Sequence, residues 1–174
     1  MRVAGIALLF LVACRATTSR PTFVPLPTAV MTELELEIPD ATRRLSEALA
    51  QDSIALSVIK EDDGFLDSGW LDAATLEHTG GRPLGLSVVR VRAWVNPSKQ
   101  FWSEVVVEAS YRPLADPSRP ERELDVVLPE DHPLQKKIAG VLRKLVERYG
   151  DKTSLPPAPK AVPAKPDTAT VRTP

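Results

Sequence analysis

The chain has 174 residues, with 22 lysines and arginines against 23 aspartates and glutamates, a formal net charge of -1 and a pI near 6.2. Such a balance argues against a nucleic-acid partner, because nucleic-acid-binding proteins usually carry a basic face and a high pI. After removal of both polar ends, about 120 residues are left, which is enough for one domain with a modest core.

The N-terminus has the layout of a secretory signal. Arg2 precedes an uncharged apolar run over 3–13, which is too short for a transmembrane helix of ~20 residues. The run ends in Leu11-Val12-Ala13-Cys14, and Cys14 is the only cysteine in the chain. This motif resembles the lipobox of bacterial lipoproteins. The alternatives are a chance cysteine beside an ordinary cleavage site, or a buried thiol in an uncleaved helix.

The lipobox resemblance implies that residues 1–13 are removed as a signal peptide and that Cys14 is acylated. Two or more acyl chains attach a protein firmly to a membrane, whereas one chain alone is marginal. Arg15 is not the aspartate that retains proteobacterial lipoproteins at the inner membrane. We therefore expect a lipid-anchored, periplasm-facing protein of the cell envelope, with the outer membrane favoured over the inner.

Proline-rich segments flank the patterned part of the chain. Residues 14–31 contain Pro21, Pro25 and Pro27 and are predicted to form a tether, with wrapping of this segment on the domain as the alternative. Residues 151–174 are rich in Pro, Ala and Lys, and we predict a disordered tail. The alternative for the tail is an arm that binds the cell wall or a partner.

The first part of the domain, over 32–150, predicts a strand, a helix and a hairpin. Residues 32–38 alternate between apolar and acidic side chains, as in a half-buried strand, and Asp40 is predicted to cap a helix over 41–51. Strands over 54–59 and 65–71 flank Asp63-Gly64, which predicts a type I′ turn. The acids over 61–63 lack the ligand spacing of a calcium loop.

Residues 86–95 and 101–112 predict the longest hairpin. If the apolar faces coincide across a loop over 96–100, Trp94 lies opposite Trp102 and Arg92 lies opposite Glu104. A further strand follows over 124–128. The clearest helix then runs from Pro133 to Tyr149, with Asp131 or His132 as its N-cap and Gly150 as a left-handed cap.

These elements predict an α+β fold of order β-α-β-β-β-β-β-α, with an antiparallel sheet of about five strands and two helices on one face. Behind a lipobox and a proline-rich tether, this layout resembles the BamC-like lipoproteins of the outer-membrane β-barrel assembly machinery. The resemblance covers about 32–150 and implies a role in outer-membrane assembly, with one domain here in place of the two in that family.

We expect no catalysis, no cofactor and no bound metal. The sequence has no Gly-x-Ser-x-Gly elbow, no His-Glu-x-x-His motif and no phosphate loop, and its histidines are His78 in a predicted loop and His132 at a predicted helix cap.

A protein-binding face is predicted on the solvent side of the long hairpin. Tryptophan and arginine are enriched at binding hot spots, and the candidate residues are Arg90, Arg92, Trp94, Trp102 and Glu104. The alternative is that another segment covers the tryptophans and forms a second small core. The function predicted first is a non-enzymatic binding or scaffolding lipoprotein with a protein partner in the envelope. A transport-associated lipoprotein that binds a lipid or another apolar ligand is second, and an exported enzyme is third.

Overall fold

The computed structural model describes residues 20–21, 24–80 and 84–150. The predicted signal peptide, the lipobox with Cys14, and the predicted tail over 151–174 lie outside the described residues. Within the described part of the chain, no helix is long and apolar enough to cross a bilayer.

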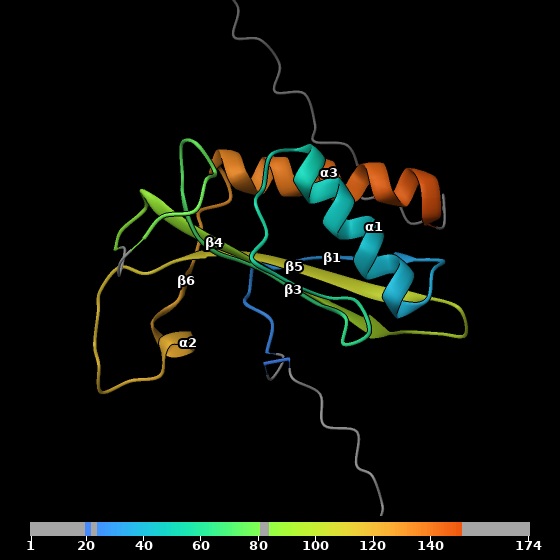
Figure 1. The fold of residues 1–174 in the computed structure, drawn as a ribbon, viewed down its shortest axis with the longest axis horizontal. Helices are drawn as coiled ribbons and strands as arrows, with labels where there is room; N and C mark the ends of the chain where they lie inside the picture. Colours follow the sequence, from blue (N-terminus) through green and yellow to red (C-terminus); the bar gives the residue numbers. More distant parts are fainter. Residues whose placement is uncertain (1–19, 22–23, 81–83, 151–174) are drawn as a thin grey trace, which may run out of the picture.

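The fold is an open antiparallel sheet covered on one face by two helices, as Figure 1 shows. Along the chain, the elements are β1 (Val30–Leu34), α1 (Ile38–Gln51), β2 (Val58–Lys60), β3 (Phe65–Asp72), β4 (Val88–Pro97), β5 (Ser103–Tyr111), α2 (Glu121–Leu124), β6 (Val126–Val127) and α3 (Pro133–Tyr149). The strands lie in the order β1-β5-β4-β3-β2, and β6 also pairs with β5. The predicted α+β class is confirmed; the short helix α2 is an addition that the sequence pattern did not predict.

The main core lies between the sheet and helices α1 and α3. Alternate residues of β4 and β5, such as Val91 and Val107, point to the helices because successive side chains of a strand face opposite ways. Leu45 of α1 and Ile138 of α3 are fully buried against them. Each such side chain stabilises the fold by about 1.5–3 kcal/mol through the area it removes from water.

The ends of the two long helices differ in part from the prediction. Helix α1 begins at Ile38, its N-cap is Glu37 and Pro39 lies in its first turn, so the prediction that Asp40 is the N-cap is wrong. Proline suits the first helical turn, because its missing N–H would have no helical partner there. The first strand accordingly ends at Leu34, not near residue 38.

Helix α3 is capped at its start by one of the two predicted residues, but its end differs from the prediction. His132 is the N-cap, and its Nδ1 accepts a hydrogen bond from the backbone N–H of Leu134 at 3.2 Å. Gly150 has a φ of -99°, so the predicted left-handed cap is wrong. Glycine is needed at this position for space, because a Cβ would lie 2.8 Å from Cγ1 of Val146.

The Asp63-Gly64 pair does end a hairpin, between β2 and β3, but the predicted type I′ turn is wrong. Lys60 pairs with Phe65 across a four-residue loop, and Gly64 is the residue of that loop with a positive φ, of 63°. Gly64 also lies against β4, because its carbonyl accepts a hydrogen bond from the N–H of Val95 at 2.8 Å. The close approach to this neighbouring strand explains the glycine.

The long hairpin has a different register from the one predicted. Trp94 pairs with Val106 and Arg92 with Glu108, so the predicted pairs of Trp94 with Trp102 and of Arg92 with Glu104 are wrong by four residues. An even shift leaves every side chain on the same face of the sheet. Matching the apolar faces therefore could not distinguish the two registers, and the turn over 98–102 decides between them.

Candidate binding surfaces

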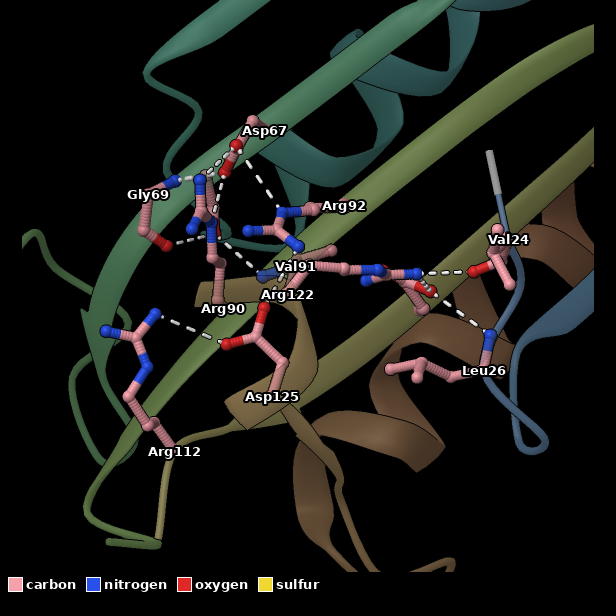
Figure 2. A network of polar contacts seen from close by, with 12 residues as sticks. Val24, Leu26, Asp67, Gly69, Arg90, Val91, Arg92, Arg112, Arg122 and Asp125 are labelled. Atoms are coloured by element: carbon pink, nitrogen blue, oxygen red, sulfur yellow. Dashed lines mark hydrogen bonds and ion pairs between the residues drawn. The ribbon is translucent and has the colours of Figure 1, made fainter. Parts of the chain in front are cut away.

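The sheet face that points away from α1 and α3, called the polar face below, carries a buried network of ion pairs (Figure 2). Asp67 of β3 accepts two hydrogen bonds from Arg90 of β4, at 2.9 Å from Nε and 2.6 Å from an Nη. Asp125 accepts one from Arg92 at 3.0 Å and one from Arg112 at 3.3 Å. Bidentate and shared arginine–carboxylate pairs of this kind fix geometry as well as charge.

A second part of the polar face is closed by α2 and by the N-terminal segment. Arg122 of α2 binds both carboxylate oxygens of Glu108 and donates to the carbonyl of Val24 at 2.5 Å. The N–H of Leu26 donates to Glu108 at 3.4 Å. The Arg122 guanidinium also lies 5.4 Å from the centre of the Trp94 ring. In Figure 2, the chain around Val24 and Leu26 runs beside Arg122.

Because α2 and the N-terminal segment cover the polar face, the predicted binding face is wrong in part. Trp94 is 1% exposed and Arg92 is buried, so neither lies on the solvent side as predicted. The alternative prediction, in which other segments cover the sheet and form a second small core, describes this part of the fold. The predicted tether is likewise not free over its described part, because residues 24–26 bond to the domain and β1 begins at Val30.

Each of the four arginines on the polar face has a carboxylate partner, and Asp125 is shared by two of them. Burial and the neighbouring Arg90 lower the pKa of Arg92, while Asp125 and Asp67 oppose that shift. Removing one member of a buried pair leaves an uncompensated charge. With its arginines engaged by buried carboxylates, this network serves to hold α2 and the N-terminal segment on the sheet.

The other two predicted site residues, Trp102 and Glu104, lie at the far end of the long hairpin. Glu104 pairs with Asn96 of β4 and with Glu33 of β1, so it is in the sheet but apart from the ion-pair network. Trp102 lies in the turn over 98–102, called the hairpin end below. The structure thus separates the five predicted residues into a covered group, Arg90, Arg92 and Trp94, and a group near the hairpin end, Trp102 and Glu104.

The hairpin end presents aromatic side chains to solvent. Phe101 is 63% exposed and has a φ of 63°, which non-glycine residues rarely adopt. Trp102 is half-buried, with the Lys99 ammonium 3.8 Å from the centre of its ring. Glu33 holds the turn through Ser98, at 2.5 Å, and through Lys99, at 3.8 Å. A positive φ at a non-glycine residue with an exposed aromatic ring makes the hairpin end a candidate functional surface.

The N-terminal segment is fixed near the same end of the sheet. An Nη atom of Arg20 donates to the carbonyl of Asp63 at 3.1 Å and to the carbonyl of Val95 at 3.2 Å. Val95 lies two residues before the end of β4 at Pro97, where the chain enters the hairpin end. The described N-terminal segment lies on the side of the sheet opposite α3 (Figure 1), and Arg20 contacts the sheet near this hairpin.

A surface that the sequence analysis missed lies on the outer half of α3. This basic face of α3 comprises Lys136, Lys137, Arg143, Lys144 and Arg148, and Glu147 is the acid among them. Lys137 and Lys144 bond to Asp52 after α1, at 2.9 and 3.0 Å. Within the described residues, Lys136, Arg143 and Arg148 have no carboxylate partner. The near-neutral charge of the whole chain hid this local excess, which a count of charges around the helix would have revealed.

An open groove of about 710 Å³ lies at the β2 edge of the sheet, beside the end of α1. Ala55, Leu56 and Ile59 give it apolar walls, and Glu47 and Glu77 add carboxylates. His78 lies beyond the groove, bridged to Leu71 of β3. Among the described residues, no group of three His, Cys, Asp or Glu side chains is placed to hold a metal ion.

Comparison with known proteins gives no relative whose function could be compared with these surfaces. A scan against protein-family models gives no match, and a search of curated proteins gives none either.

Proposed function

We propose that this protein is a bacterial envelope lipoprotein, anchored through acyl chains on Cys14, that acts as a non-enzymatic scaffold. Its partner is a protein with an acidic surface, and its contact surface is the basic face of α3. The observation that carries the proposal is the excess of cations on one exposed helix face, in which Lys136, Arg143 and Arg148 have no carboxylate partner among the described residues.

The position of the N-terminal segment supports the choice of α3 as the contact surface. Residues 24–26 cross the polar face of the sheet, and α3 covers the opposite face (Figure 1). An anchor at Cys14 would bring the polar face nearer to the bilayer than α3, so the basic face of α3 would stay exposed to the periplasm. That surface is then available to a periplasmic partner. Arg15, directly after the lipobox, favours the outer membrane, in line with the resemblance to assembly lipoproteins.

The electrostatic contact is expected to steer association more than to supply raw affinity. Lys136 and Arg148 are twelve residues apart, so the cations extend over about 18 Å of helix. Each exposed ion pair contributes only about 0–1 kcal/mol. A row of like charges nevertheless raises the association rate, and screening at high salt removes the effect.

The anchor and the contact surface need separate experiments. Palmitate labelling that is sensitive to globomycin, with Cys14→Ala as control, tests the anchor. For the contact surface, a photo-crosslinking amino acid replaces Arg143 on α3 or, as control, Arg44 on α1, which is paired with Glu47. We expect a salt-sensitive crosslink to one envelope protein from position 143 and none from position 44. Equal crosslinking from both positions would contradict the assigned surface.

A second candidate function is carriage of an apolar ligand, and the groove beside β2 favours it. Ile59 is 51% exposed there, next to Leu56 and Ala55. Native mass spectrometry of the purified protein should then show a bound lipid that is lost in Ile59→Arg. Protein that is free of lipid in its native membrane extract would argue against this candidate.

A further inference from the structure

We propose that the hairpin end is a second membrane contact, in which Phe101 and Trp102 enter the interfacial layer of the leaflet that holds the acyl chains of Cys14. This inference rests on the proposed lipidation of Cys14. It adds to the anchor a fixed orientation of the domain, which acyl chains alone would not provide.

The first argument is the short length of chain between the anchor and the domain. Cys14 and Arg20 are six residues apart, and six residues span at most about 20 Å in any conformation. Arg20 is tied to the domain through the carbonyls of Asp63 and Val95. The acylated cysteine would therefore hold the Arg20 site within about 20 Å of the lipid headgroups, and the domain would lie against the bilayer.

The second argument is the part of the domain that this attachment brings near the bilayer. From Val95, four further residues at about 3.3 Å each reach Lys99, so the hairpin end begins within about 13 Å of the Arg20 site. The β2–β3 turn, which contains Asp63, is at the same end of the sheet, because Phe65 pairs with Trp94. The hairpin end is thus within reach of the surface to which the anchor would bind.

The third argument is the chemistry of the hairpin end. Tryptophan is enriched at membrane–water interfaces, where its ring sits among headgroups, and lysine extends its ammonium to the phosphates. Here the Lys99 ammonium lies over the Trp102 ring, and exposed Phe101 extends from the same turn. Glu33 faces Lys99 and offsets its charge, and Glu104 follows on β5. The contact should therefore depend on apolar insertion and not on anionic lipid.

The test places the acylated protein in vesicles of phosphatidylethanolamine and phosphatidylcholine. The acyl chains of these lipids carry bromine, which quenches nearby tryptophan fluorescence. We expect quenching in the wild type and loss of most of it in Trp102→Phe, because Trp94 is buried and Trp70 lies toward the other end of β3, against Arg90 and Arg112. Phe101→Gly removes the aromatic ring and relieves the positive φ. It should reduce quenching without loss of thermal stability, a combination that a purely structural role of Phe101 would not give.

The outcomes separate this proposal from the proposed function. Protein that carries no acyl chain overturns both. Acylated protein that enters the vesicles but shows no quenching, or equal quenching in the wild type and in Trp102→Phe, overturns the membrane contact alone. Quenching that appears only in vesicles with anionic lipid, and that salt abolishes, would also overturn it, because the contact would then be electrostatic.

Discussion

Arg122 of α2 and Glu108 of β5 meet on the polar face of the sheet, and the Glu108 side chain there is 1% exposed. The same arginine holds the carbonyl of Val24, and the same carboxylate accepts from Leu26. One ion pair therefore joins the sheet, the covering helix and the chain that leads to the predicted anchor. The N-terminal segment is attached to the domain through this pair.

Glu108→Ala should destabilise the domain strongly. The substitution leaves the Arg122 guanidinium without its carboxylate and the N–H of Leu26 without an acceptor. Breaking a buried pair in this way costs about 3–5 kcal/mol, and the partial exposure of Arg122 places the expected loss at the lower end. The free energy of unfolding in urea measures the change.

The matched control for Glu108→Ala is Glu123→Ala. Glu123 pairs with Arg119, and both side chains are more than half exposed. Its loss should cost at most about 1 kcal/mol, because water screens and solvates exposed pairs. Similar losses in the two variants would show that Glu108 is not buried as described.

Gly64→Ala and Gly140→Ala should change stability in opposite directions. A Cβ at Gly64 would lie 2.3 Å from the carbonyl oxygen of Val95, in a backbone conformation with a φ of 63°. A Cβ at Gly140, within α3, would meet no atom within 4 Å. We expect a loss of more than about 1 kcal/mol at position 64 and a gain of about 0.4–1 kcal/mol at position 140. Thermal unfolding of the two variants beside the wild type tests both signs.

How much of the fold could be predicted from sequence depends on the range of the interactions that decide each feature. Local patterns were sufficient for the α+β class, for the hairpin at Asp63-Gly64 and for a cap of α3 by Asp131 or His132, of which His132 is the one observed. The register of β4 with β5 was not decided by alternation, because every even shift preserves the buried face.

The candidate site was harder to predict than the fold. Trp94 alternates like a solvent-facing residue, yet α2 and residues 24–26, both distant in sequence, cover its face. Alternation within one strand says which face a residue occupies but not what lies on that face. The exposure of Phe101 depends in turn on a positive φ, which Gly or Asn would have signalled and Phe does not.

His132→Ala should weaken the start of α3. The Nδ1 atom of His132 accepts from the N–H of Leu134, which has no helical acceptor in the first turn. Loss of an N-cap side chain costs about 0.5–2 kcal/mol. His78→Ala is the control, since its imidazole is exposed and the bridge to Leu71 is made by the backbone. Urea unfolding of both variants should show a loss at position 132 only, and an equal loss at position 78 would contradict the capping role.

Asp72 should contribute a part of the acid sensitivity of the domain. Its carboxylate accepts hydrogen bonds from the N–H groups of Thr75 and Ala74, at 3.0 and 2.9 Å, and these bonds lower its pKa in the folded state below the usual 3.8. A carboxyl group with a lowered pKa stabilises the fold above its unfolded pKa, and this stabilisation is lost as the pH falls through the folded pKa.

Asn at position 72 can still accept both bonds but does not titrate. The free energy of unfolding should therefore fall less in Asp72→Asn than in the wild type when the pH is lowered from 5 to 3. Because Asp72 is at the surface, the difference should be small and should shrink further with added salt. Identical pH profiles for the two proteins would show that the turn after β3 does not stabilise the ionised form.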